Sequence, residues 1–238
     1  MAGDMLGVDE FNNPKTYLML LAELLGTFFL VFFGCGAAIF PHQIEEILQV
    51  SLAFGLTLIC LVHGFGPVSG CHVNPAITLS FLVLQKIPIL RSICYILMQL
   101  VGASVAVFIL DAMTPSNVKG GLTVVSSILS PWQGMVLELS GAFILTYAVH
   151  SASGDGRGGG AVVIGLTLVG CEMFLFNFTG ASMNPARSFG PALVYSHFTD
   201  HWVYWLGPIL GAIIAAFVHK IMSSAEGGAG GNKDEESA

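Results

Sequence analysis

The chain has 238 residues, of which 54% are hydrophobic and only 10% are charged. A soluble domain carries about 25% charged residues, so this composition excludes an ordinary soluble enzyme and a disordered tail protein. The net charge of -7, with 8 Lys and Arg residues in total, leaves no basic surface for binding nucleic acid. A membrane-spanning helix needs roughly 20 apolar residues, so the chain has room for about six spans with short loops.

Six apolar runs are long enough to cross a bilayer, and we expect each of them to form a helix. In chain order they are Tyr17–Phe40, Ile47–Phe65, Ile87–Leu110, Pro131–Ser151, Ala161–Phe178 and His201–Met222. Glycines inside these runs predict helices that pack closely against one another. Residues 1–16 are polar and acidic, which is typical of a cytoplasmic segment and not of a signal peptide. Residues 223–238 are rich in Gly, Ser and Glu, which predicts a disordered cytoplasmic tail.

The positive charges are distributed unevenly over the segments that connect the runs. One set of segments and termini carries Lys15, Lys86, Arg91, Arg157, Lys220 and Lys233. The opposite set carries only Lys119, with Arg187 left out because it lies between the last two runs. Because Lys and Arg accumulate on the cytoplasmic side, this bias predicts that both termini lie in the cytoplasm. We expect a multi-pass protein of the plasma membrane.

The two halves of the chain repeat each other. Gly55-Leu56-Thr57-Leu58 recurs 110 residues later as Gly165-Leu166-Thr167-Leu168, and Asn74-Pro75-Ala76 recurs at the same offset as Asn184-Pro185-Ala186. Looser matches pair Glu23 with Glu138 and Gly102 with Gly211. Each repeat contains three spans, an odd number, so residues 129–222 are predicted to be inverted relative to residues 17–128. Inverted repeats place their functional elements near the middle of the membrane.

Each Asn-Pro-Ala motif predicts the start of a helix that is too short to span the membrane. Asn favours the N-cap and Pro the first turn, so half-helices are expected near 75–85 and 185–195. Lipid tolerates the extended backbone before each motif only where that backbone lines a cavity or is buried in protein. The two half-helices would meet at mid-membrane with their N-termini facing, and the positive ends of their dipoles would oppose the passage of cations.

This arrangement predicts a narrow pore with one polar strip. The side-chain amides of Asn74 and Asn184 would donate hydrogen bonds into the lumen. Backbone carbonyls before the motifs would accept them, at Gly70, Cys71, His72, Gly180, Ala181 and Ser182. Such a pore passes small neutral molecules and rejects ions, which lose hydration that the wall does not replace. The chain has no metal-ligand cluster and no set of nucleophile and base, so we expect no cofactor, no metal and no enzymatic activity.

The twin Asn-Pro-Ala motifs, the Arg187 that follows the second one and the two Glu-x-x-Gly repeats resemble the aquaporin family from about Leu18 to Met222. The resemblance implies an all-α membrane protein with six transmembrane helices and two half-helices in an inverted three-span repeat. It also implies a homotetramer with one water pore per subunit that excludes ions and protons. Carried over by position, the selectivity filter is Phe54, Glu172, Ala181 and Arg187, the apolar pore wall includes Leu58 and Leu168, and the acids that brace the pore loops are Glu23 and Glu138.

Two residues of the chain bear on which solutes the pore takes. Ser188 resembles the water-selective branch, because glycerol-conducting relatives usually carry Asp at that position. Glu172 departs from both branches, which usually carry His or a small residue there. Two arrangements of Glu172 are open, an ion pair with Arg187 or a solvated position in the extracellular vestibule.

Three other functions remain as alternatives to a water channel. One is a broader pore that also passes glycerol, urea or peroxide. Another, of a different class, is a structural or adhesive membrane protein with a vestigial pore. A secondary transporter would need a coupling-ion site, and Glu172 is the only obvious lumenal acid.

Overall fold

The computed structural model describes residues 5–39, 46–115, 118–154 and 159–230. Six of its helices are long and apolar enough to cross a membrane. They are α1 (Pro14–Ala37), α2 (Glu46–Ser69), α4 (Ile89–Met113), α5 (Pro131–Gly154), α6 (Gly160–Thr179) and α8 (Val203–Gly230). The short helices are α3 (Pro75–Val83), α7 (Pro185–Val194) and the 3-10 helix η1 (Val8–Asn12). The expected fold class, six spans with two half-helices, is confirmed.

The ends of two long helices differ from the expected bounds. α1 begins at Pro14, ahead of Tyr17, because the Asn13 side chain accepts a hydrogen bond from the backbone N–H of Lys15 at 3.0 Å and caps the helix. α8 continues past Met222 to Gly230, so residues 223–230 of the expected disordered tail are helical. Residues 231–238 lie outside the described residues, as do Arg157 and Lys233.

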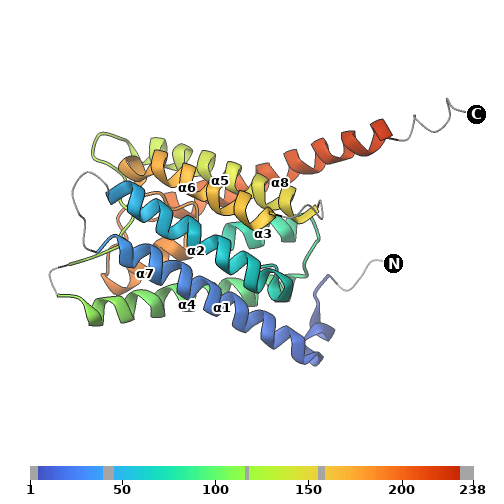
Figure 1. Cartoon of the computed structure of the whole chain (residues 1–238), viewed down its shortest axis with the longest axis horizontal. Coiled ribbons are helices and arrows are strands. Elements are labelled where there is room, and N and C mark those ends of the chain that lie inside the picture. Colours follow the sequence, from blue (N-terminus) through green and yellow to red (C-terminus); the bar gives the residue numbers. More distant parts are fainter. Residues whose placement is uncertain (1–4, 40–45, 116–117, 155–158, 231–238) are drawn as a thin grey trace, which may run out of the picture.

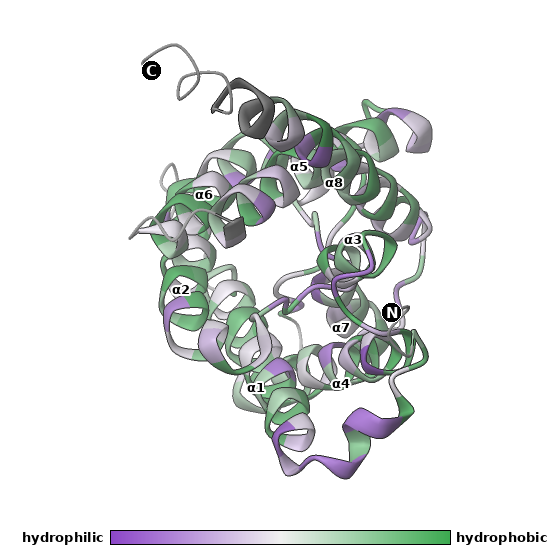
Figure 2. Ribbon diagram, turned by 90° about the vertical axis from the view of Figure 1, so that its right-hand side faces the viewer, coloured by the Kyte–Doolittle hydropathy of each residue, from purple (hydrophilic) through white to green (hydrophobic). Residues whose placement is uncertain are grey.

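The helices form a bundle around the two half-helices (Figures 1 and 2). α1 packs against α4 and α5 packs against α8, which are equivalent pairs in the two repeats, and α2 packs against α6 across the repeats. α3 lies in the half of the molecule that contains the start of α1 and the end of α8, and α7 lies in the opposite half (Figure 1). Many large apolar side chains remain exposed on the outside, including Phe33, Phe108 and Phe174. This exterior suits contact with lipid.

The crossing of α2 and α6 uses the repeated Gly-Leu-Thr-Leu sequence. A methyl group added at Gly55 would lie 2.6 Å from the carbonyl oxygen of Gly165, and one added at Gly165 would lie 2.5 Å from that of Gly55. Only bare glycines therefore let the two backbones approach so closely, as small residues do in membrane helices. Three residues further along each helix, Leu58 and Leu168 line a cavity inside the bundle.

We expect Gly165→Leu to disrupt this crossing. The added side chain has to displace the backbone of α2, and overpacking of this kind costs about 1–3 kcal/mol or more. The melting temperature of the detergent-solubilised protein should fall by roughly 5 °C or more. Gly170→Leu is the matched control, because Gly170 lies on the same helix and a methyl group there meets nothing within 4 Å. Equal melting temperatures for the two variants would contradict the proposed role of the crossing.

Candidate pore

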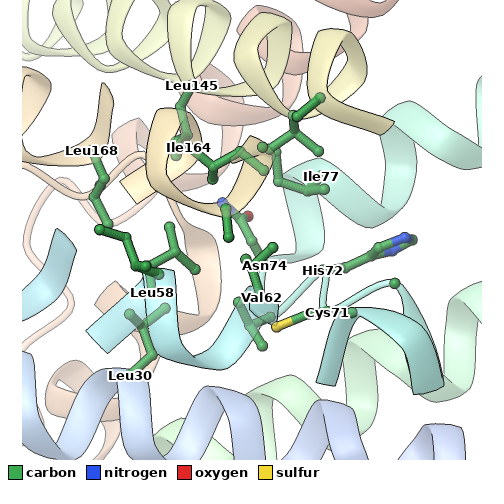
Figure 3. Close-up of a pocket in the computed structure, with 18 of the residues that line it drawn as sticks. Leu30, Leu58, Val62, Cys71, His72, Asn74, Ile77, Leu145, Ile164 and Leu168 are labelled. Atoms are coloured by element: carbon green, nitrogen blue, oxygen red, sulfur yellow. The ribbon is translucent and has the colours of Figure 1, made fainter. Parts of the chain in front are cut away.

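A cavity of about 640 Å³ lies inside the bundle. At one end it is lined by Ser153 and by residues 159–162, where α5 is followed by α6, and at the other end by Phe54, Glu172 and Arg187. Most of its wall is apolar, with Leu30, Leu58, Val62, Ile77, Leu145, Ile164 and Leu168 from five different helices (Figure 3). The structure thus places both predicted wall residues, Leu58 and Leu168, on the cavity.

The two motif asparagines bind each other's pore loops across the middle of the bundle. Asn74 Nδ2 donates to the carbonyl oxygen of Met183 at 2.9 Å, and Asn184 Nδ2 donates to that of Val73 at 2.8 Å. The other side-chain atom, Oδ1, caps the half-helix that follows: it accepts from the N–H of Ala76 at 2.9 Å in α3 and from that of Ala186 at 3.0 Å in α7. The half-helices therefore face each other with their N-termini, and both asparagines line the cavity.

The backbone before each motif adopts the left-handed region at corresponding positions. In the first repeat φ is 89° at Gly70, 49° at Cys71 and 43° at Val73. In the second repeat Gly180, Ala181 and Met183 have φ of 77°, 50° and 51°. This region is unfavourable for residues other than glycine, and most of all for a β-branched valine. Such conformations persist only where surrounding contacts hold them.

Two fully buried glutamates provide those contacts. Glu23 accepts hydrogen bonds from the backbone N–H groups of His72 at 2.8 Å and Val73 at 2.7 Å, and from the Ser69 hydroxyl at 2.7 Å. Gln99 Nε2 donates a further bond to the same carboxylate at 2.7 Å. The glutamates therefore hold strained backbone and do not need to touch a solute.

Glu138 makes the equivalent bonds in the second repeat. It accepts from the N–H groups of Ser182 at 2.9 Å and Met183 at 2.6 Å, and from the Thr179 hydroxyl at 2.6 Å. The structure thus places both predicted acids behind the pore loops, in the bracing position that the resemblance implies.

Two tyrosines that sequence reasoning did not place in the site complete the bracing. The Tyr95 hydroxyl donates to the carbonyl of Ser69 and the Tyr204 hydroxyl to that of Thr179, both at 2.9 Å. The signal for this pair is present in the sequence, because the tyrosines are 109 residues apart, the same offset as Gly102 and Gly211.

The predicted carbonyl residues do not all lie on the cavity. Gly70, Cys71, His72 and Ser182 line it, whereas Gly180 and Ala181 are outside the lining given by the described residues. The Cys71 sulfur is directed toward Val62, and the His72 ring points the other way (Figure 3). That ring packs against Phe81 with centroids 4.5 Å apart and ring planes inclined by 31°, and its Nδ1 lies 3.2 Å from the Thr78 hydroxyl. His72 therefore acts as a packed, orienting side chain.

Arg187 and Phe54 close one end of the cavity. The guanidinium carbon lies 5.0 Å from the centroid of the Phe54 ring. Its two terminal nitrogens donate to backbone carbonyls, Nη1 to Gly121 and Nη2 to Gly180 at 3.4 Å. The Phe54 ring lies so close to Gly34 that a methyl group there would clash with it. The arginine is thus held over the Phe54 ring, with only 3% of its surface exposed.

Glu172 fits neither of the two arrangements expected for it. It is only 1% exposed, so it does not lie in an open vestibule, and within the described ranges it makes no ion pair with Arg187 at 4.0 Å or less. Its Oε2 atom is buried without a hydrogen-bond partner, and so is Arg187 Nε. The reason is that the carbonyls of Gly121 and Gly180 hold the guanidinium over Phe54, whereas Glu172 is fixed to α6.

Comparisons with known proteins agree with this geometry. The family described as Major intrinsic protein matches residues 10–219. Aquaporin-5 of Mus musculus is 44% identical over 218 residues, which cover 88% of this chain and 82% of the relative. The Lens fiber major intrinsic protein of Ovis aries is 39% identical over 221 residues, which cover 90% and 84% of the two chains.

A solved structure has the same fold. The X-ray structure of the aquaglyceroporin from Plasmodium falciparum matches 87% of this chain and 97% of its own, with a TM-score of 0.78. Its sequence identity is 21%, so this likeness concerns the fold alone.

Proposed function

Because the chain belongs to the Major intrinsic protein family and is a multi-pass water channel of the aquaporin type, not an enzyme, we propose that water crosses through the cavity that ends at Arg187. The observation that carries this proposal is the exchange of hydrogen bonds between the Asn74 and Asn184 side chains and the opposite pore loops. It supports a path in which two helix N-termini face each other across the lumen.

The same geometry explains how water passes while ions are rejected. Each asparagine amide has two N–H groups and uses one of them on the opposite loop, so one remains for the oxygen of a passing water. The pore-loop carbonyls accept the hydrogens of water, while the leucine wall offers no other partner. An ion that enters loses hydration worth several kcal/mol or more, and a cation is also repelled by the two positive helix ends.

We further propose that Phe54, Glu172, Ala181 and Arg187 form the selectivity filter. The cavity end lined by Phe54, Glu172 and Arg187 supports three of these residues, whereas Ala181 is assigned from the family resemblance. A pore braced at matching positions in both repeats favours an open channel over a vestigial one. Passage of glycerol, urea or peroxide depends on this filter and on Glu172 in particular.

A homotetramer in the plasma membrane, with both termini in the cytoplasm, completes the proposal. The start of α1 and the end of α8 lie at the same end of the bundle (Figure 1). The Arg91 side chain, in the first turn of α4, forms an ion pair with Glu10 at 3.3 Å. This pair ties the start of α4 to the N-terminal segment. Cross-linking in native membranes should trap four copies, and tags on either terminus should be inaccessible to antibody until the cells are permeabilised.

The central test measures water flow and ion current on one preparation. Proteoliposomes should show fast osmotic water flow with a low activation energy and no proton or potassium current. Leu168→Trp should reduce water flow to near the rate of protein-free vesicles, because the indole fills the apolar wall of the cavity. Met173→Trp is the control, since Met173 is 49% exposed on the outside of α6. A parent-like rate for Leu168→Trp would show that water takes another path.

A further inference from the structure

The N-terminal segment, residues 5–13, is fastened to the start of α4 by backbone hydrogen bonds. The N–H group of Ile89, the first residue of this helix, donates to the carbonyl of Met5 at 2.9 Å. The next N–H group, that of Leu90, donates to the carbonyl of Leu6 at 3.1 Å. The N-cap residue of α4 makes no side-chain cap hydrogen bond. The segment therefore supplies acceptors for N–H groups that have no partner within their own helix.

An ion pair and a close packing contact fix the same junction. Glu10 Oε2 lies 3.3 Å from Arg91 Nε, which is ion-pair distance without the alignment of a hydrogen bond. Gly7 has a φ of 73° and lies so close to Pro88 that an added methyl group would be 2.5 Å from the proline Cβ. The segment is thus seated in one position on the start of α4.

Arg91 begins a polar row along one face of α4. Tyr95 and Gln99 follow at intervals of four residues, so the three side chains lie on the same side of the helix. The Tyr95 hydroxyl holds the carbonyl of Ser69, and its ring meets that of His72 edge-on with centroids 5.4 Å apart. Gln99 donates to the glutamate that braces this first pore loop. The row therefore leads from the N-terminal segment to the loop.

The two parts of the row meet at the tyrosine hydroxyl. The charges of Glu10 and Arg91 both act on the Tyr95 hydroxyl. Because Glu10 holds the guanidinium, it fixes the position of that positive charge relative to the hydroxyl. The hydroxyl in turn holds a loop in which Cys71 and Val73 have φ of 49° and 43°. Such backbone keeps its conformation only where surrounding contacts hold it.

The second repeat does not carry the same row. The positions 109 residues later are Asp200, Tyr204 and Pro208, so only the tyrosine is shared. Tyr204 makes the equivalent bond, to the carbonyl of Thr179. An arginine and a glutamine at the other two positions are therefore not a general requirement for bracing a pore loop. Their presence in the first repeat coincides with the contact to the N-terminal segment.

We propose that residues 5–13 act as a clasp that positions the first pore loop, with Glu10 and Arg91 as positioning residues. Both act on the loop through Tyr95. While the clasp is docked, the loop keeps its strained conformation and the path stays open to water. When the clasp is released, the loop relaxes and water flow falls. The effect on water flow rests on the proposed function, whereas the effect on the loop does not.

Hydrogen exchange of both pore loops in the full-length protein tests this proposal, together with stopped-flow water permeability of the same preparation. In Glu10→Gln the amides of residues 70–74 should exchange faster by roughly fivefold, which corresponds to about 1 kcal/mol, the upper value for an exposed ion pair. The amides of residues 180–184 should exchange as in the parent, and water permeability should fall. Asp9→Asn is the matched control, because Asp9 is the neighbouring exposed acid of η1.

Exchanging the two charges gives an independent result. Arg91→Glu should also speed the exchange of residues 70–74, and adding Glu10→Arg should restore the slow exchange and the water flow. In Tyr95→Phe the hydroxyl contact is lost, so adding Glu10→Gln should change the exchange of the loop no further. A double-mutant cycle of this kind separates an effect that passes through Tyr95 from one that does not.

Three results would overturn the inference. One is equal acceleration of both pore loops in Glu10→Gln, which would show a general loss of stability. Another is parent-like exchange of residues 70–74 in that variant, and the third is a charge exchange that restores nothing. A folded parent that passes no water would overturn the proposed function, while the exchange of residues 70–74 would still decide whether the clasp positions the loop.

Discussion

Glu138→Gln is expected to abolish water flow, because it removes the support of the second pore loop. The carboxylate accepts on both oxygens, from Thr179 and Ser182 on one and from Met183 on the other. A glutamine amide accepts on one atom only. In either orientation its NH₂ group faces the backbone N–H of Ser182 or of Met183, so a buried donor meets a donor.

The expected loss of folding free energy in Glu138→Gln is large compared with the total stability of a protein. A hydrogen bond to a charged group contributes about 1.5–3 kcal/mol, and a buried donor left without an acceptor adds to that loss. The total stability of a folded protein is only about 5–15 kcal/mol. Met183 has a strained φ of 51°. In the described structure its N–H group has no side-chain acceptor other than Glu138. The pore loop should therefore relax, and the cavity should lose its polar strip.

Thermal unfolding in detergent and stopped-flow water permeability measure this effect together. Thr179→Val keeps the shape and both backbone bonds to Glu138. It removes the hydroxyl that donates to Glu138 and accepts from the N–H of Ala181 at 3.3 Å, so its loss of stability should be smaller than that of Glu138→Gln. Ser140→Ala is the control, because the exposed Ser140 hydroxyl donates to the carbonyl of Leu137 within its own helix. If Glu138→Gln keeps the melting temperature and water permeability of Ser140→Ala, Glu138 does not brace the loop.

The features that sequence reasoning predicted well are those with a local pattern. The six spans follow from the length of the apolar runs, and the half-helices from Asn and Pro at adjacent positions. Close helix packing was expected from the glycines inside the apolar runs, and Gly55 and Gly165 provide it where α2 crosses α6. In each case the residues that decide the structure are neighbours in the chain or copies of one another.

The arrangement of Glu172 could not be predicted because it depends on distant contacts. The guanidinium of Arg187 is held by the carbonyl of Gly121, a residue 66 positions earlier in a segment without a recognisable motif. Nothing near Glu172 or Arg187 in the sequence indicates that this bond competes with an ion pair. The hydroxyl bonds of Tyr95 and Tyr204 are distant in the same way. The filter residues taken from the family resemblance stay predictions until solute permeabilities are measured.

Arg187→Val is expected to open the closed end of the cavity and to admit larger solutes. The substitution removes the guanidinium that covers the Phe54 ring at 5.0 Å and frees the carbonyls of Gly121 and Gly180. These carbonyls become hydrated because the opening brings water to them. The ratio of glycerol to water permeability should rise by about tenfold, which corresponds to a barrier lower by 1.4 kcal/mol.

Arg187→Lys separates the shape of the filter from its charge. Lysine keeps the positive charge but presents a single ammonium group, which does not reproduce the planar fork that holds two carbonyls at once. The Lys variant should therefore admit more glycerol than the parent while still conducting no cations. The Val variant should admit more glycerol and also conduct cations. Stopped-flow permeability and planar-bilayer current on the same preparations test this. Parent-like glycerol ratios in Arg187→Val would show that Arg187 is not the filter, and cation currents of equal size in both variants would show that its charge does not exclude cations.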